Sequence, residues 1–171
     1  MYNYKYCPLC SNELVEKIPD NEELVRKVCE KCGFIWYNNP VPACGVFVTD
    51  SEGRILLGKR KYPPEVGGWT LPAGFMEQGE GPDECAVREA QEETGLNVKI
   101  TGLMNAYKAG DDPRTKVVLI IYFADIVSGE LRAGDDVAEV GWFHIDKLPD
   151  FIAFSAHKKA LKEYREKYLE K

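Results

Sequence analysis

Apolar residues fall mainly into short runs separated by glycine, proline and charged positions, a pattern typical of β-strands. The runs at residues 43–50 and 54–60 flank a Ser-Glu-Gly turn and predict two neighbouring strands. Four more strands are predicted farther along the chain, at residues 67–75, 97–109, 116–127 and 140–145. Nearer the N-terminus, residues 14–32 predict two shorter strands joined by a turn at Pro19-Asp20-Asn21.

Two segments show the spacing of helices instead. Residues 82–94 begin with a proline suited to a first helical turn, and Gly95 suits a helix C-terminus. Residues 155–171 begin with Ser155 as the expected N-cap and repeat apolar residues at helical spacing, at Ala156, Ala160, Leu161, Tyr164 and Tyr168. We expect this apolar stripe to pack on the domain or on a partner. Between about residues 38 and 152, a single predicted helix among many strands indicates an α/β or α+β sandwich.

Composition and charge exclude several classes of protein. The 171 residues, of which 44% are hydrophobic, suffice for one domain with a buried core, or for one domain plus a small module. The net charge of −6 argues against non-specific nucleic-acid binding by the whole chain. No apolar run is long enough to span a membrane, and the N-terminus lacks an apolar signal-peptide core. We therefore expect a cytoplasmic protein with reduced cysteines.

Four of the six cysteines form a C-x2-C-x18-C-x2-C pattern at Cys7, Cys10, Cys29 and Cys32. This spacing predicts a four-cysteine zinc site, and Gly33 permits the tight turn after the second pair. A redox dithiol is the main alternative, and the doubled motif argues against it. A zinc ribbon can also contact nucleic acid, but no basic stripe accompanies these cysteines. We expect residues 1–37 to form a zinc ribbon and residues 38–171 to form a second domain.

Seven acidic side chains and one arginine crowd residues 74–96. On the predicted helix, Glu89, Glu92 and Glu93 are spaced by three and four residues, so they share one side and repel one another. A solvated helix face is the ordinary explanation for such charges. A divalent cation would relieve the repulsion, and carboxylate oxygens suit Mg²⁺ or Mn²⁺, which often bridge to substrate phosphates. The cluster therefore indicates a candidate site for one of these cations.

The same residues follow the pattern G-x5-E-x7-R-E-U-x-E-E-x-G-U, where U is an apolar residue. The matching positions are Gly74, Glu80, Arg88, Glu89, Ala90, Glu92, Glu93, Gly95 and Leu96. This pattern resembles the signature box of the Nudix hydrolases. The approach "WTLPAGF", the later "VGWFHIDKLP" and the cysteine module are also similar to members of that family. The resemblance covers nearly the whole chain and implies a Nudix-type α/β/α sandwich with a mixed sheet, preceded by a small zinc ribbon.

The resemblance implies hydrolysis of a nucleoside diphosphate linked to another moiety, with Mg²⁺ or Mn²⁺ as the cofactor. By that resemblance Glu89 and Glu93 are the main metal ligands, and Glu92 is a further ligand or holds a metal-bound water. The backbone carbonyl of Ala73 or Gly74 completes the metal site. The physical chemistry agrees, because a divalent cation neutralises pyrophosphate charge, polarises a P–O bond and lowers the pKa of an attacking water.

Other residues receive roles that have alternatives. By the same resemblance, Glu80 and Arg88 brace the loop against the helix. The general base is expected at Glu139, ahead of the last strand, with the last two glutamates of the box as alternatives; an ordinary surface acid is the other interpretation of Glu139. Arg60 ends a strand where it binds phosphate oxygens or simply faces solvent. Trp69 can stack on a nucleobase, although aromatic residues in strands more often belong to the core.

The choice of substrate rests on features that distinguish subgroups of the family. The proline- and tryptophan-rich motif that follows the box in NADH pyrophosphatases is absent. ADP-ribose pyrophosphatases tend to carry a proline after the box, and Pro113 lies seventeen residues after Leu96. These features favour ADP-ribose or an FAD-like dinucleotide as substrate, with release of AMP. The alternatives are NADH or another nucleotide, and a non-catalytic nucleotide sensor whose ribbon binds a partner. Related members are commonly homodimers.

Overall fold

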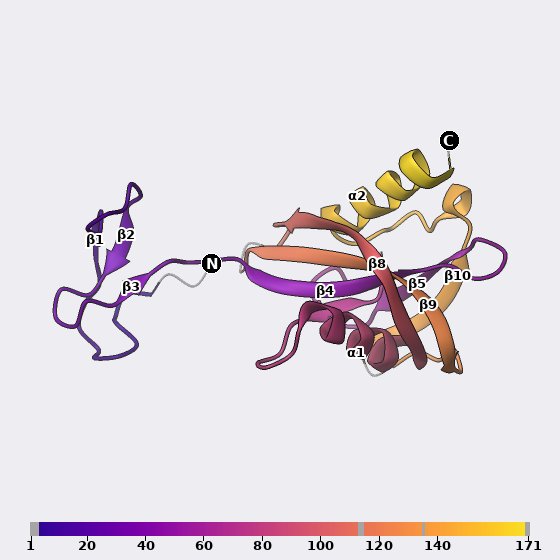
Figure 1. Ribbon diagram of the computed structural model, residues 1–171, viewed down its shortest axis with the longest axis horizontal. Coiled ribbons are helices and arrows are strands. Elements are labelled where there is room, and N and C mark those ends of the chain that lie inside the picture. The colour runs from indigo at the N-terminus through magenta and orange to yellow at the C-terminus, as the bar shows by residue number, and fades with distance from the viewer. Residues whose placement is uncertain (1–3, 113–114, 135, 170–171) are drawn as a thin grey trace. The chain divides into compact units, whose positions relative to one another are not determined.

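The computed structural model describes residues 4–112, 115–134 and 136–169, and it divides the chain into two compact units (Figure 1). The first unit spans Met1–Pro40 and the second spans Val41–Lys171. Each unit has a hydrophobic core of its own. Within the described residues, no helix has the length and apolar character needed to cross a membrane.

The first unit is built on three short antiparallel strands, β1 (Val15–Lys17), β2 (Arg26–Val28) and β3 (Ile35–Trp36). The first two are the predicted pair, and the third was not predicted. Among the described residues of this unit, the buried apolar cluster consists of Cys7, Leu14 and Cys29, with Cys10 and Phe34 packed against it. So small a core cannot stabilise a unit of this length by burial alone, which makes a metal held by the cysteines physically reasonable.

The second unit contains two sheets. Four strands form a mixed sheet in the order β7-β4-β9-β8, with bounds Ala73–Phe75, Val41–Val48, Val117–Gly129 and Leu96–Ala109. In it β4 runs parallel to β9, and the other neighbours are antiparallel. Three strands form an antiparallel sheet in the order β10-β5-β6, with bounds Val137–Phe143, Ile55–Arg60 and Trp69–Thr70. The strand predicted at 67–75 is thus two strands, β6 and β7, and the chain changes sheets between them.

Two helices cover opposite faces of the mixed sheet (Figure 1). Helix α1 (Pro82–Thr94) packs on one face through small buried side chains, those of Cys85, Ala86 and Ala90. Helix α2 (Ser155–Tyr164) packs on the other face through the first residues of the predicted apolar stripe. Successive side chains of β4 point to opposite faces, so Val46 joins the core under α1 and Phe47 the core under α2. This arrangement confirms the predicted α/β/α sandwich.

The start of α2 differs from the prediction. Phe154, at a φ of 58°, occupies the cap position, and Ser155 is the first helical residue. Ser155 donates its N–H (3.0 Å) and its hydroxyl (2.9 Å) to the Asp111 carboxylate. The prediction of Ser155 as the N-cap is therefore wrong, because the acceptor comes from the loop after β8, which helical spacing cannot reveal. A 3₁₀ turn (Ile145–Lys147) precedes α2, and a π-helical turn (Arg165–Leu169) follows it.

Candidate active site

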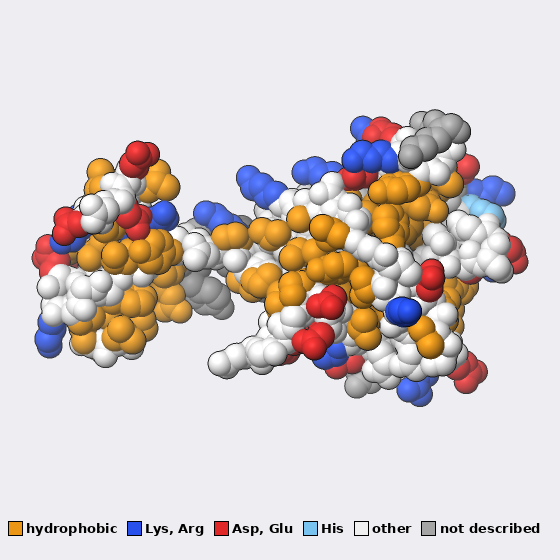
Figure 2. Space-filling model, viewed as in Figure 1, with side chains coloured by type: hydrophobic (Ala, Val, Ile, Leu, Met, Phe, Trp, Pro, Cys, Tyr) orange, Lys and Arg blue, Asp and Glu red, His pale blue; other side chains and the backbone are white. Residues whose placement is uncertain are grey.

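The predicted acidic segment folds as a short loop followed by α1, directly after β7. The helix spans Pro82–Thr94, which confirms the predicted bounds, and Gly95 closes it at a φ of 73°. At its start the Glu84 carboxylate accepts the Gly81 N–H at 2.7 Å, which satisfies one backbone donor at the helix terminus. Acidic side chains gather over this part of the surface (Figure 2). The acidic cluster therefore sits on one regular element anchored to the end of β7.

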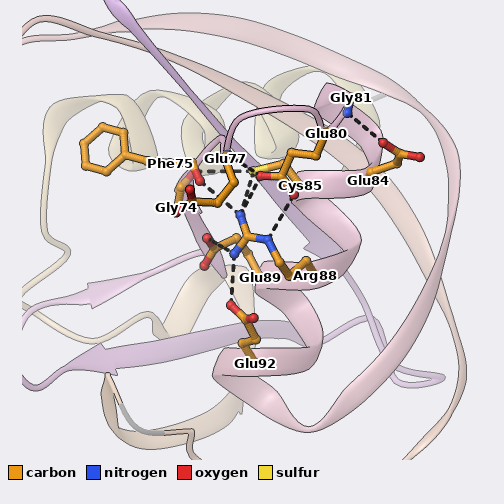
Figure 3. Close-up of polar contacts among 10 residues, drawn as sticks. All are labelled: Gly74, Phe75, Glu77, Glu80, Gly81, Glu84, Cys85, Arg88, Glu89 and Glu92. Carbon is orange, nitrogen blue, oxygen red and sulfur yellow. Dashed lines mark hydrogen bonds and ion pairs between the residues drawn. The ribbon is translucent and has the colours of Figure 1, made fainter.

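Arg88 is the centre of the polar contacts in this segment (Figure 3). Its Nε and Nη2 bind the two oxygens of Glu80 at 3.0 and 2.7 Å, which joins the loop to the helix and lowers the pKa of Glu80 to about 2. Its Nη1 also binds Glu89 (2.7 Å) and Glu92 (2.9 Å), and Nη2 binds the carbonyl of Phe75 (3.0 Å). The contacts with Glu89 and Glu92 were not predicted, although Arg88 and Glu92 are four residues apart, a spacing that makes them neighbours on a helix face. One guanidinium thus holds three glutamates and the end of β7.

Glu93 lies against the strand that leads into the loop. Its Oε2 accepts the N–H of Ala73 at 3.1 Å. Burial, followed by the charge of Glu89, raises the pKa of Glu93 to about 8, although the Ala73 hydrogen bond and the charge of Arg60 act in the opposite direction. Burial also raises the pKa of Glu89. Two neighbouring carboxylates whose charged forms are both disfavoured are suited to binding a cation.

Gly74 shows how closely the strand approaches these carboxylates. A Cβ built at Gly74 would overlap the carboxylate of Glu89, so any other residue here would displace that side chain. The Gly74 carbonyl faces the first turn of α1, where the Cys85 thiol lies 3.7 Å away. The predicted metal residues Ala73, Gly74, Glu89 and Glu93 therefore come together in the fold. Their hard oxygen atoms fit a divalent cation such as Mg²⁺ or Mn²⁺.

A second candidate metal site lies in the first unit. The Sγ atoms of Cys7, Cys10, Cys29 and Cys32 all lie within 4.8 Å of one another, with 3.4 Å between Cys10 and Cys29. Tetrahedral zinc with Zn–S bonds of about 2.3 Å requires about 3.8 Å between sulfurs, so the cluster fits that ion. Burial opposes ionisation of Cys29, but hydrogen bonds from the following backbone and from neighbouring thiols outweigh it and lower its pKa to about 6. Gly33, at a φ of 77°, makes the predicted tight turn.

Arg60, a predicted substrate-binding residue, lies at the end of β5. Its Nε donates to the carbonyl of Pro64 (2.7 Å) and its Nη2 to that of Tyr62 (3.3 Å), and its guanidinium lies 4.9 Å from the ring centroid of Phe154. Burial lowers the pKa of Arg60, while the charge of Glu93 acts to raise it. The two side chains are therefore close enough to interact electrostatically, which brings Arg60 toward the carboxylate cluster.

Trp69 and Glu139, two other predicted site residues, lie beside Lys59. The Trp69 ring is 8% exposed, packs edge-to-face on Phe143, and has the Lys59 ammonium 5.7 Å above it. Glu139 lies within β10 rather than ahead of it, opposite Lys59, with 3.4 Å between the ammonium and the carboxylate. Because successive strand residues point to opposite faces, Lys59 and Glu139 project from the face away from Arg60.

Asp136 is an acidic residue near the site that sequence reasoning did not single out. Its charge acts to raise the pKa of both Glu93 and Arg60, although burial keeps the pKa of Arg60 lowered. The backbone explains the approach: the Gly134 N–H donates to the Glu93 carbonyl (3.0 Å), and the Asp136 carbonyl accepts the Lys61 N–H (3.1 Å). The connection from β9 to β10 thus passes the end of α1. The only sequence signal was an acidic residue just before a predicted strand.

Comparisons with known proteins place the chain in a family. Residues 39–164 match the NUDIX domain model, and residues 5–38 match the Nudix N-terminal model. The chain therefore belongs to the Nudix hydrolase family. The ADP-ribose pyrophosphatase of Methanocaldococcus jannaschii is 43% identical over 118 residues, which cover 68% of this chain and 69% of that protein. A crystal structure of a NUDIX hydrolase from Nitrosomonas europaea matches with a TM-score of 0.81 and 34% identity, over 96% of this chain and 92% of that one.

The NAD-capped RNA hydrolases that the chain matches are longer than this chain. The NAD-capped RNA hydrolase NudC of Pseudomonas aeruginosa is 29% identical over 153 residues, which cover 87% of this chain and 51% of that protein. The chain spans about half the length of the NAD-capped RNA hydrolases that it matches. Pro113, which contributed to the choice of ADP-ribose, lies outside the described residues.

Proposed function

We propose that the protein is a Mg²⁺- or Mn²⁺-dependent pyrophosphatase that splits a nucleoside diphosphate linked to another moiety. ADP-ribose or an FAD-like dinucleotide is the favoured substrate, and AMP is the expected product. The observation that carries the proposal is the complete carboxylate set, with three glutamates bound to Arg88 and Glu93 bound to the Ala73 N–H, which a protein that only sensed a nucleotide would not need. The name of the Methanocaldococcus jannaschii relative supports ADP-ribose.

Glu89, Glu92 and Glu93, with the backbone carbonyl of Ala73 or Gly74, would hold the cation. The raised pKa values of Glu89 and Glu93 support this assignment, since a cation would favour their charged forms. When bound, the cation neutralises pyrophosphate charge and lowers the pKa of the attacking water. The contribution of Arg88 is to keep the glutamates aligned with the loop.

Arg60 is proposed to bind a phosphate of the substrate. The carbonyls of Pro64 and Tyr62 engage its Nε and Nη2 and so orient the guanidinium, which supports a fixed position for this charge. Trp69 is proposed to line the substrate site, with contact limited to the 8% of its surface that is exposed. Both assignments predict a raised KM with a smaller change in kcat when the side chain is shortened.

The general base is proposed among four carboxylates. Glu139 is the assignment from the sequence, Glu92 and Glu93 are its alternatives, and Asp136 joins them because its charge acts on Glu93. Glu139→Gln tests the residue in β10, and Asp136→Asn tests the residue in the loop before it. Neither substitution changes α1. The base is identified by a fall in kcat of roughly 100-fold or more together with loss of the acidic limb of the pH–rate profile.

Other assignments concern the whole protein. We propose structural Zn²⁺ on the four ribbon cysteines, which the clustering of their sulfur atoms supports, and we propose a cytoplasmic location. We propose a homodimer whose interface lies outside Ala156, Ala160 and Leu161, because these residues are already packed in the core of their own unit. The net charge of −6 gives no support to nucleic acid as a general partner.

The test is product analysis with Mg²⁺ and with Mn²⁺ across ADP-ribose, FAD, NADH, nucleoside triphosphates, diadenosine polyphosphates and a short NAD-capped RNA. Wild type is compared with Glu93→Gln, and Glu84→Gln is the matched control because Glu84 caps the same helix. AMP from ADP-ribose or FAD, made at near wild-type rate by the control and roughly 100-fold more slowly by Glu93→Gln, would support the proposal. Binding without turnover of any compound would instead indicate a nucleotide sensor.

A further inference from the structure

Leu71 lies where the chain passes from one sheet to the other. Strand β6 ends at Thr70 in one sheet, and β7 begins at Ala73 in the other, so neither ladder extends to the N–H of Leu71. Leu71 is fully buried, and a buried backbone donor without a partner is strongly unfavourable. The partner is a side chain of α2: Nδ1 of His157 accepts the Leu71 N–H at 3.2 Å.

This hydrogen bond extends a short backbone ladder. The Trp69 N–H donates to the Phe151 carbonyl (2.9 Å), and the Ala153 N–H donates to the Trp69 carbonyl (2.9 Å). A parallel ladder would next offer a backbone carbonyl to Leu71. The chain instead turns into α2 at Phe154, at a φ of 58°. The imidazole of His157, in the first turn of the helix, supplies the acceptor in place of the backbone.

The residues after Leu71 reach the carboxylate cluster directly. Pro72 has no N–H, and its carbonyl accepts the Val46 N–H at 3.0 Å. The next N–H, that of Ala73, is the donor to Glu93, and Gly74 follows against Glu89. The segment is thus held at Leu71 and Pro72 immediately before the two residues that contact the glutamates.

We propose that His157 is a positioning residue for the candidate cation site: through Leu71 it fixes the segment 71–74 so that Ala73 meets Glu93 and Gly74 lies against Glu89. The proposal rests on the proposed function only in assuming that these glutamates bind a divalent cation. His157 must be neutral with its proton on Nε2 to accept at Nδ1. Burial, with the charge of Arg60, lowers its pKa to about 4, which is consistent with a neutral ring at pH 7.

Three variants of the full-length, zinc-loaded protein test this role. His157→Asn keeps an oxygen acceptor close to the position of Nδ1, and His157→Leu fills similar space without an acceptor. Leu161→Ala is the control, because it weakens the packing of the same helix in the same core and keeps the imidazole that accepts the Leu71 N–H. Two readouts are independent of catalysis: hydrogen exchange of the Leu71 and Ala73 amides, relative to core amides of β9, and Mn²⁺ affinity from water-proton relaxation.

For His157→Leu we expect exchange at Leu71 and Ala73 to rise by about 10-fold or more relative to β9, and Mn²⁺ binding to weaken by about 5-fold or more. His157→Asn and Leu161→Ala should stay within about twofold of wild type in both relative measures. If His157→Leu does not fold, His157→Gln, whose acceptor lies one bond farther out, carries the same expectation. The proposal would be overturned if the acceptor-less variant, or His157→Gln in its place, matched Leu161→Ala in both amide exchange and Mn²⁺ affinity. Faster amide exchange with unchanged Mn²⁺ affinity would overturn it as well. Since neither readout uses a substrate, failure of the proposed hydrolysis would leave this result standing.

Discussion

Replacing Glu93 by glutamine is expected to stabilise the cation-free protein at alkaline pH. In the folded state, burial and the charge of Glu89 raise the pKa of Glu93 from 4.5 to about 8. A group whose pKa is higher when folded contributes stability below its unfolded pKa, and this contribution is lost as pH rises through the folded pKa. The free energy of unfolding of cation-free wild type should therefore fall between about pH 5 and pH 9, whereas that of Glu93→Gln should fall less.

The expected size follows from the pKa. Each pKa unit corresponds to about 1.4 kcal/mol, so a rise from 4.5 to about 8 amounts to about 5 kcal/mol once Glu93 is ionised. Relaxation of the folded site and residual structure in the unfolded chain reduce this value, and we expect about 2–4 kcal/mol. Glutamine retains an oxygen that can accept the Ala73 N–H, which lies 3.1 Å from the wild-type carboxylate, so the hydrogen bond is kept while the charge is removed.

Urea unfolding at several pH values measures the effect. A Trp36→Phe background leaves Trp69 and Trp142 as fluorescence reporters, and both belong to the second unit. The protein is exchanged into divalent-free buffer without a strong chelator, so that zinc remains on the cysteines. Added Mn²⁺ should then stabilise wild type but not Glu93→Gln, while Glu84→Gln should follow the wild-type pH dependence. Lower stability of cation-free Glu93→Gln than of wild type at about pH 9 would refute the reasoning.

Three further substitutions have distinct expected outcomes. Gly74→Ala should weaken Mn²⁺ binding by about 10-fold or more, because its Cβ would displace Glu89. Gly102→Ala, which places its Cβ within 4 Å of no other atom, should leave Mn²⁺ binding unchanged. Calorimetric titration compares the two variants, and equal Mn²⁺ affinities would contradict the steric argument. Arg88→Lys loses the two-nitrogen contact with Glu80. This loss should lower the free energy of unfolding by about 1–3 kcal/mol and kcat by roughly 100-fold. Normal kinetics and stability of the variant would contradict the role proposed for Arg88. Cys10→Ser should abolish stoichiometric zinc binding while leaving unfolding of the second unit unchanged, and retained zinc by mass spectrometry would rule out the four-cysteine site.

Features that depend on neighbouring residues were predicted well. The bounds of α1 follow from Pro82 and Gly95, which act on the backbone within one turn of the helix. The cysteine cluster follows from two C-x2-C pairs, because each pair brings two sulfurs to one side of an ion. The order of glutamates in the box likewise determined which carboxylates share one helix side.

Other predictions failed where the outcome depended on pairing between distant segments. Glu139 was expected before β10 but lies within it, and an irregularity between Val137 and Glu139 sets the face from which its side chain projects. Ser155 was expected to cap α2, and Asp111 supplies the acceptor instead. In both cases the local sequence is compatible with more than one arrangement, and the neighbouring strand or loop selects between them.

The sequence by itself thus determined the family resemblance, the bounds of α1 and the side of α1 that carries the glutamates, since backbone preferences and helical spacing act over a few residues. Only the tertiary structure decided which distant groups meet those glutamates: Ala73 at Glu93, Asp136 near both Glu93 and Arg60, and His157 at Leu71. His157 and Leu71 are 86 residues apart. Their hydrogen bond exists because the chain changes sheets at Leu71 and α2 packs across that point, and burial there makes an unpaired N–H unfavourable.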